Sequence, residues 1–343
     1  MTLSFAGPGW KMQYGRPSGP GGAAPLGINV FAAYDTSDIY KYNESGQLVS
    51  SYSATGTIED MAISPNGVLS LADRGNAQIV LLDTSLTKTG SFPINSGNCQ
   101  SVAIGASGNI IVGGRDDGGA IYISKYSNSG SFMWQYPVGG HVRQIDADAS
   151  GYIYAGCDDF YVYRLTPTGA LDWRYNKSSD KMLTVSYDPI NDYVFSQRDS
   201  YNGWQMYKWN ATGTIVSSWA TSEKNPIREL CVDASGYILG AIIRNFSLGT
   251  PSGGIVKYRS DATINHNLVL NIEPTAGSYS TVSVDTKGYI YGGGNPSGVA
   301  TVKKWDASGN VIWSVADMPA TAADVRSVVS SPRIGPFPSY WGV

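Results

Sequence analysis

The sequence is poor in charged residues and histidine. Charged residues make up 15% of its 343 residues, well below the roughly 25% of ordinary soluble domains. The formal net charge of −3 is close to neutral, so there is no electrostatic footprint for nucleic acid, which is not an expected partner. The two histidines, His141 and His266, form no HxH or HExxH spacing, so no metal site is expected.

Long apolar runs and targeting signals are also missing. No apolar run approaches the length of a membrane-spanning helix, so membrane insertion is not expected. The N-terminus lacks a basic segment followed by an apolar one, so we expect no Sec signal peptide. The three cysteines (Cys99, Cys157 and Cys231) lie far apart and form no CxxC. They are predicted to be buried thiols without a disulfide framework.

Turn and strand formers are abundant instead. The chain has 41 glycines, 23 tyrosines and 9 tryptophans, together with many Ser, Thr and Val residues. Hydrophobic residues make up 42%, which is enough for a large core. This composition predicts an all-β protein with many tight turns.

Two phrases recur along the chain. The first is a strand with a basic residue near its end, a turn, and a strand that often ends in Trp. Its clear copies are 38–52, 120–134, 160–173, 204–219 and 299–313, and its degenerate copies are 77–92 and 254–270. The second is a strand, a turn that usually contains Gly, and another strand. Its copies are 61–73, 102–114, 145–156, 185–196, 230–240 and 282–293.

A period of roughly 40–50 residues with four strands per unit indicates a β-propeller. The strand count predicts seven blades of four strands within residues 28–331. The strands in 28–53 are the second to fourth of a blade, and 324–331 is an inner strand without followers. Because an open blade would expose unpaired edges, we expect 324–331 to pair with the N-terminal strands and close the ring. Residues 1–27 are then a Gly/Pro-rich arm and 332–343 a tail.

One repeat phrase resembles those of known propeller families. Residues 304–313 (KWDASGNVIW) resemble the repeat of the quinoprotein-like (PQQ-type) propellers, and 145–156 and 282–293 are similar to YVTN or NHL-type repeats. The resemblance implies that Gly makes the turn between the two outer strands and that Trp packs between blades. The calcium site and adjacent cysteines of quinone-dependent enzymes have no match here, so no cofactor is expected. Such a resemblance does not carry function.

Aligning the inner strands on their core position places two polar columns before it. The first polar column is Glu59, Gln100, Arg143, Leu183, Arg228, Ser280 and Arg326. The second polar column is Asp60, Ser101, Gln144, Thr184, Glu229, Thr281 and Ser327. Inner strands converge on the axis, so we expect these residues to cluster at one end of the channel. Two alternatives remain open, namely a site for a carboxylate or sugar and an ion network that holds the blades together. The candidate binding residues are Glu59, Asp60, Gln100, Arg143, Arg228, Glu229 and Arg326.

A basic column occupies one position of the third strand in six blades. Its members are Lys41, Lys125, Arg164, Lys208, Lys257 and Lys304. It is either a belt for a polyanion or, as we expect, a set of aliphatic stems on the blade faces with their charged heads in solvent. The carboxylate pairs Asp116–Asp117 and Asp158–Asp159 are expected to make local loop hydrogen bonds. No nucleophile elbow, P-loop or HExxH motif is present, so no catalytic residue is assigned.

The arm carries three separate aromatics, Phe5, Trp10 and Tyr14, which are suited to anchor it on a partner. We therefore expect a non-enzymatic structural or adhesion component of a large assembly. The composition resembles phage tail and fibre proteins, which favours a bacteriophage virion, as a tail, fibre or capsid-decorating component. Its expected partners are other virion proteins, bound through the arm, and a host-surface glycan stacked on loop Tyr and Trp residues. The alternative is a propeller enzyme, such as a lyase or a quinone-dependent dehydrogenase.

Overall fold

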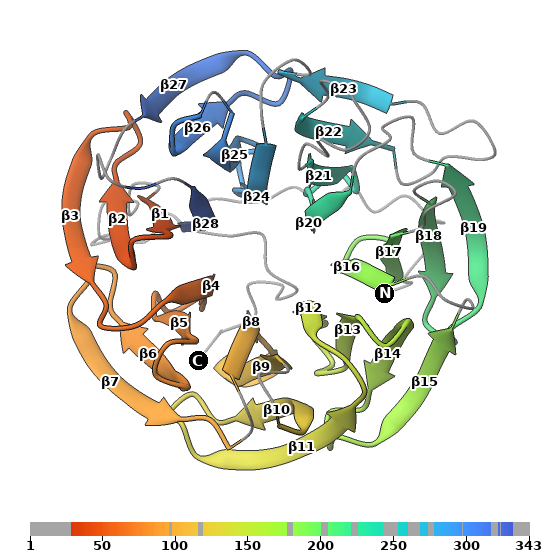
Figure 1. The fold of residues 1–343 in the computed structure, drawn as a ribbon. Coiled ribbons are helices and arrows are strands. Elements are labelled where there is room, and N and C mark those ends of the chain that lie inside the picture. The colour runs from red at the N-terminus through yellow and green to blue at the C-terminus, as the bar shows by residue number, and fades with distance from the viewer. Residues whose placement is uncertain are drawn as a thin grey trace, which may run out of the picture.

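The computed structural model describes most of the predicted propeller. The described residues are 29–95, 98–115, 119–176, 181–199, 205–220, 226–242, 253–259, 268–273, 278–296, 298–316, 322 and 324–331. Within these ranges, 28 strands form seven four-stranded antiparallel sheets. Figure 1 shows the sheets arranged as blades around a central axis, which confirms the predicted seven-bladed β-propeller.

Each blade runs from an inner strand at the axis to an outer strand at the rim (Figure 1). The inner strands are β4 (Ile58–Ile63), β8 (Asn98–Ile104), β12 (Val142–Ala147), β16 (Lys181–Asp188), β20 (Ile227–Val232), β24 (Ser278–Val284) and β28 (Val325–Ser331). The second strands are β1 (Asn29–Tyr34), β5 (Leu69–Asp73), β9 (Ile110–Arg115), β13 (Ile153–Cys157), β17 (Tyr193–Asp199), β21 (Ile238–Ile242) and β25 (Ile290–Asn295).

The other two strands of each blade face the rim. The third strands are β2 (Asp38–Tyr42), β6 (Gln78–Leu82), β10 (Ile121–Tyr126), β14 (Tyr161–Leu165), β18 (Gln205–Asn210), β22 (Gly254–Tyr258) and β26 (Thr301–Trp305). The outer strands are β3 (Leu48–Ser53), β7 (Lys88–Pro93), β11 (Phe132–Val138), β15 (Leu171–Asn176), β19 (Ile215–Ala220), β23 (Leu268–Ile272) and β27 (Val311–Ala316). A short 3-10 helix, η1 (Ala106–Gly108), lies between β8 and β9.

The hydrophobic core lies between neighbouring blades. One cluster joins Phe31 and Ile39 of one blade to Leu69 and Leu82 of the next. Second strands such as β5 and β13 are buried along their whole length, because a neighbouring blade covers each of their faces. The three cysteines are buried and free, as predicted.

The ring closes as the sequence predicts. Strand β28 pairs antiparallel with β1, and the register sets Ser331 opposite Asn29 and Val328 opposite Ala32. The side chains of Val325 and Val328 are fully buried. The two ends of the propeller therefore share one blade, and neither leaves an open inner edge.

The Trp and Gly of the first repeat phrase meet across a blade boundary. Gly169, in the turn between β14 and β15, has a φ of +87°, and a Cβ there would lie 2.5 Å from the Trp134 ring of the preceding blade. The indole N–H of Trp134 and the ammonium of Lys125 both donate to the Pro167 carbonyl of that turn, each at 3.1 Å. The turn glycine and the packing of Trp between blades are thus as the resemblance implies.

The same inter-blade clasp, a basic residue and a Trp that share one carbonyl of the next blade's turn, recurs twice. Arg164 and Trp173 donate to the carbonyl of Ala211. Lys304 and Trp313 donate to the carbonyl of Glu44, which ties the last complete blade to the blade that holds both chain ends.

The expectation that the heads of the basic column lie in solvent is wrong for five of its six members. Lys125, Arg164, Lys208, Lys257 and Lys304 are each at most 9% exposed. Their heads find partners within their own blade or in the turn of the next blade. The ammonium of Lys208 lies 3.8 Å from the centroid of the Tyr193 ring, and that of Lys257 lies 2.9 Å from the Asp233 carboxylate. Cation–π contacts and ion pairs replace water in this position.

Candidate functional site at the channel mouth

A β-bulge lies in every inner strand, at the same place. The pairing between the inner and second strands skips one residue in each of the seven blades. The skipped residues are Glu59, Gln100, Arg143, Leu183, Arg228, Ser280 and Arg326. A bulge leaves its extra residue unpaired and changes the direction of its side chain. The seven bulged residues are the whole first polar column.

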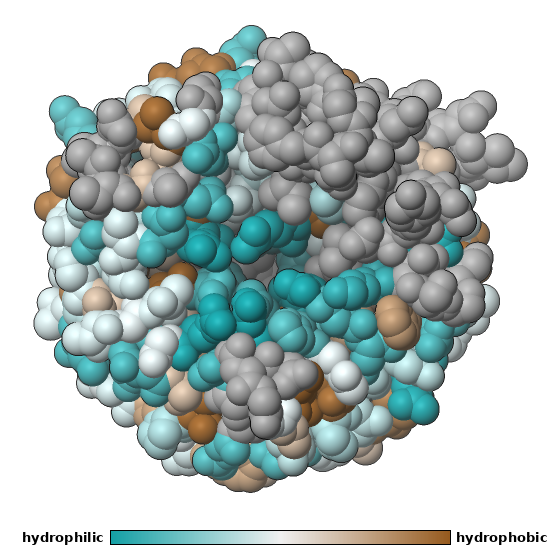
Figure 2. Space-filling model, viewed as in Figure 1, coloured by the Kyte–Doolittle hydropathy of each residue, from teal (hydrophilic) through white to brown (hydrophobic). Residues whose placement is uncertain are grey.

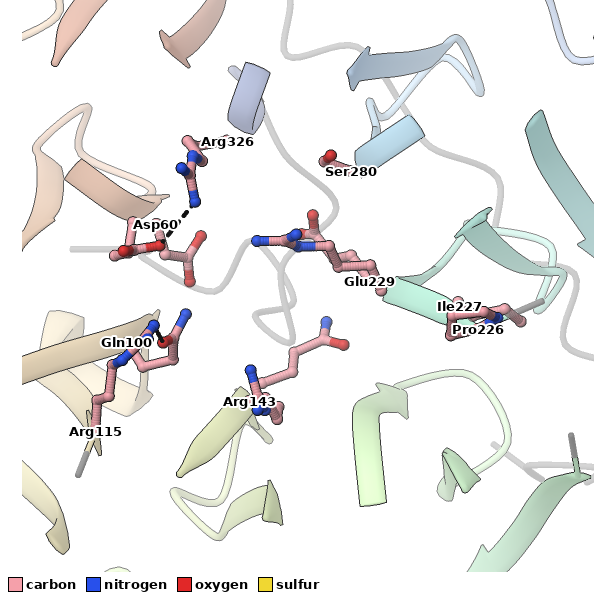
Figure 3. Close-up of a pocket in the computed structure, with 12 residues that line it drawn as sticks. Asp60, Gln100, Arg115, Arg143, Pro226, Ile227, Glu229, Ser280 and Arg326 are labelled. Atoms are coloured by element: carbon pink, nitrogen blue, oxygen red, sulfur yellow. Dashed lines mark hydrogen bonds and ion pairs between the residues drawn. The ribbon is translucent and has the colours of Figure 1, made fainter. Parts of the chain in front are cut away.

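The two polar columns bring charged side chains around one cavity. It has a volume of about 200 Å³ and lies where the inner strands converge, in a hydrophilic hollow (Figures 2 and 3). Its lining is Glu59, Asp60, Gln100, Arg115, Arg143, Gln144, Pro226, Ile227, Arg228, Glu229, Ser280 and Arg326. We call this set the channel mouth. All seven candidate binding residues from the sequence belong to it.

Three lining residues, Arg115, Pro226 and Ile227, lie outside the two polar columns and were missed. Arg115 ends the second strand β9 and donates to Gln100 Oε1 at 2.9 Å (Figure 3). Pro226 directly precedes β20. The sequence comparison aligned inner strands only, so a residue from a second strand gave no signal. The side chain of Leu183 lies outside the described residues.

The second polar column fastens the inner strands to one another. At five blade boundaries its side chain accepts the backbone N–H of the next inner strand's core residue, at 2.9–3.3 Å. The acceptor and donor pairs are Asp60 and Val102, Gln144 and Val185, Glu229 and Val282, Thr281 and Val328, and Ser327 and Met61. The column therefore has a structural role, carried by hydrogen bonds to backbone amides.

Some residues of the first polar column form ion pairs. The buried Glu59 carboxylate accepts from Arg74 at 3.2 Å and from Arg326 at 3.4 Å, so it joins β4 to the closing strand β28. Arg143 makes a two-point contact with Asp158 of its own blade, with Nε 2.8 Å from Oδ1. The Asp158 carboxylate also pairs with Lys181 of the next inner strand, β16, at 3.4 Å, so both networks cross a blade boundary.

Arg228 differs from the other arginines of the mouth. Its side chain is exposed to the channel. Within the described part of the chain, its guanidinium has no hydrogen-bond or salt-bridge partner. Desolvation by the channel walls lowers the pKa of Arg228, and the charges of Arg326 and Arg143 add to this, while Asp324 and Glu59 oppose it. Among the described residues, no carboxylate forms an ion pair with this positive charge at the mouth.

Asp324 lies beside this arginine as a buried carboxyl group. Ser280 Oγ donates to both of its carboxylate oxygens, at 3.2 and 3.0 Å. Burial raises the pKa of Asp324, and the positive charge of Arg228 opposes that rise without cancelling it. The Asp324 carboxylate is therefore engaged by Ser280 and is a poor permanent partner for Arg228.

The carboxylate pairs have local roles where they are described. Asp158 binds Arg143 and Lys181, and Asp159 accepts from the Gly139 amide at 2.8 Å and from the Tyr163 hydroxyl at 2.6 Å. Asp159 thus makes the expected local hydrogen bonds, whereas Asp158 departs from that expectation and forms ion pairs with cations of the inner strands β12 and β16. Asp116–Asp117 and the arm residues Phe5, Trp10 and Tyr14 lie outside the described residues.

Two kinds of feature are absent from the described residues. They contain no group of three or more His, Cys, Asp and Glu side chains placed to hold a metal ion. No helix among them is long and apolar enough to cross a membrane.

Comparison with known proteins shows the fold. No family model matches the sequence, and no curated protein matches it. Hydrazine synthase from Kuenenia stuttgartiensis matches with a TM-score of 0.59 and 14% identity, over 72% of this chain and 76% of that one. A protein of unknown function from Bacteroides caccae has a TM-score of 0.55, and a functionally unknown protein from Desulfotomaculum acetoxidans DSM 771 has 0.69. Each of these two is 12% identical, with 89% of this chain and 98% of that one covered. At these identities, the likeness to this chain lies in the propeller fold.

Proposed function

We propose that this chain is a non-enzymatic binding propeller that holds an anionic group of its ligand at the channel mouth. The observation that carries the proposal is Arg228, a channel-facing arginine with no direct counterion among the described residues. A bulge turns it toward the axis, as bulges beside binding sites commonly do. An arriving anion would meet a positive charge that the fold has already positioned.

The surrounding contacts support a site for a ligand at this place. The positive charges of Arg143 and Arg326 act on Arg228 and lower its pKa. Each of these two arginines already has a carboxylate partner, Asp158 for Arg143 and Glu59 for Arg326. The second polar column holds the strands in place through hydrogen bonds of its own. Removing the charge of Arg228 should therefore affect an incoming anion much more than it affects the blades.

The test compares melting temperatures in sodium acetate, phosphate and chloride at equal ionic strength. At ten times its dissociation constant, an anion that binds only the folded state stabilises it by about 1.4 kcal/mol. That corresponds to a rise of a few degrees. Some anions stabilise any protein by exclusion from its surface, so the readout is the difference between wild type and Arg228→Ala. We expect the extra rise to disappear in Arg228→Ala.

The matched control is Arg174→Ala, which removes an exposed arginine from the outer strand β15, far from the axis. This variant should keep the anion-dependent rise. An equal rise in wild type and in Arg228→Ala would contradict the proposed function.

The setting that we propose is a large assembly, and the composition favours a bacteriophage virion. In this proposal residues 1–27 attach the propeller to other virion proteins, with Phe5, Trp10 and Tyr14 as anchors, and a host-surface glycan is a candidate ligand. The relation to PQQ-type or YVTN/NHL-type propellers stays a prediction from the repeat phrases. Deleting residues 1–27 should leave the melting temperature unchanged and remove the propeller from purified particles. Retention at wild-type occupancy would contradict the role of the arm.

A further inference from the structure

The charge balance of the channel mouth limits the charge of its ligand. Among the described residues, four arginines and three carboxylates line the cavity, which leaves one surplus positive charge. They are Arg115, Arg143, Arg228, Arg326, Glu59, Asp60 and Glu229. A carboxylate, with one negative charge, would balance this surplus. A phosphate monoester carries about −1.5 to −2 at pH 7 and would leave the mouth negative.

The hydrogen-bond donors that remain at the mouth also suit a carboxylate. The guanidinium of Arg228 is a planar fork that binds a carboxylate through two parallel hydrogen bonds. Gln100 uses its Oε1 to accept from Arg115, and its NH₂ group has no acceptor among the described residues. An incoming carboxylate could accept two hydrogen bonds from the guanidinium of Arg228, while a neighbouring oxygen of the ligand accepts one from the NH₂ group of Gln100.

The size and lining of the cavity limit the rest of the ligand. Its volume of about 200 Å³ is below the roughly 300–1,000 Å³ of pockets that enclose drug-sized molecules. Among the described residues that line it, none is aromatic, and Pro226 and Ile227 supply the apolar surface. Stacking of a sugar ring on Tyr or Trp therefore has no partner at the mouth. A small group, or the end of a longer chain, fits this space.

We infer that the anion held at the channel mouth is a single carboxylate on a small polar ligand or chain end, with Arg228 as its principal cation. This inference rests on the proposed function and narrows it to one chemical class. The carboxylate has two possible sources, an acidic sugar and an acidic amino-acid side chain. Both present the same planar group to the arginine fork.

The experiment measures dissociation constants for the full chain by ligand-observed NMR. The probes are glucuronate, glucose and glucose 6-phosphate, together with acetyl-glutamate amide and acetyl-glutamine amide. We expect at least one carboxylate probe to bind at least tenfold more tightly than its neutral counterpart and than glucose 6-phosphate. The carboxylate that binds more tightly identifies the source.

Two variants and one control locate the binding. Arg228→Ala should abolish the preference for the carboxylate, and Arg228→Lys should restore only part of it, because an ammonium lacks the planar fork. Arg174→Ala should bind as wild type does, and unchanged melting temperatures will show that all variants are folded. Equal losses in Arg228→Ala and Arg174→Ala would overturn the inference.

The outcomes separate the inference from the proposed function. Tighter binding of glucose 6-phosphate than of either carboxylate, lost in Arg228→Ala, would overturn the carboxylate inference while the anion site stands. Absence of any Arg228-dependent anion effect, here and in the melting experiment, would overturn both.

Discussion

The closing strand β28 should decide whether the propeller folds at all. Its valines Val325, Val328 and Val329 are at most 3% exposed. Burying one such side chain contributes about 1.5–3 kcal/mol, so the three together contribute roughly 5–9 kcal/mol. That range covers much of the total stability of about 5–15 kcal/mol that is usual for a folded domain. Removing residues 325–343 should therefore abolish the cooperative urea transition, followed by circular dichroism.

Two comparisons make this prediction sharper. Removing only residues 332–343 keeps β28 and should leave the transition unchanged. Val328→Ala should cost about 2 kcal/mol, from the lost methyl groups and the cavity that remains. Val282 is the core residue at the same position of β24, an inner strand whose blade does not contain the chain ends. Val282→Ala should lower the free energy of unfolding by about as much. A chain without β28 that unfolds with the wild-type midpoint and slope would refute the reasoning.

Three further predictions concern the contacts between blades. Gly169→Ala should cost roughly 1–3 kcal/mol in denaturant unfolding, because a Cβ would clash with Trp134 at a positive φ. Gly90→Ala, where a Cβ has 3.9 Å of room, should cost much less, and equal costs would argue against the clasp. Asp60→Ala should lower the free energy of unfolding by about 1–3 kcal/mol, because it leaves the backbone amide of Val102 in the next inner strand without its acceptor. A neutral effect would show that the hydrogen bonds of the second polar column do not stabilise the propeller. Burial raises the pKa of Asp158, but its arginine and lysine partners outweigh burial and hold that pKa below the usual value. Its stabilising contribution is thus present above pH 4 and is lost as the pH falls through the lowered pKa. Asp158→Asn should flatten the acid limb of a stability–pH profile, and an unchanged limb would contradict this assignment.

The sequence was most informative about features that each repeat states locally. The period, the turn glycines and the unmatched strand at 324–331 predicted the blades and their closure, which the β28–β1 pairing confirms. The alignment of inner strands also collected the seven candidate residues of the channel mouth, because equivalent positions of a ring must converge on its axis.

The basic column shows where such local reasoning failed. Lysine usually keeps its ammonium in water, so solvent-exposed heads were the natural expectation. The true partners are a Tyr ring on the adjacent strand, as for Lys208 and Tyr193, or a carbonyl of the neighbouring blade, as for Lys125 and Pro167. Neither partner can be paired with its lysine from one strand of sequence.

The sequence by itself determined the blade number, the strand order and the way the ring closes, because these follow from periodicity and from the need to pair strand edges. Only the tertiary structure decided which charged residue faces the channel without an ion-pair partner among the described residues. The seven bulges are shifts in register between two strands, so they depend on pairing that no single strand encodes. The isolation of Arg228 likewise depends on which carboxylates the neighbouring blades have already engaged, as Glu59 is engaged by Arg74 and Arg326.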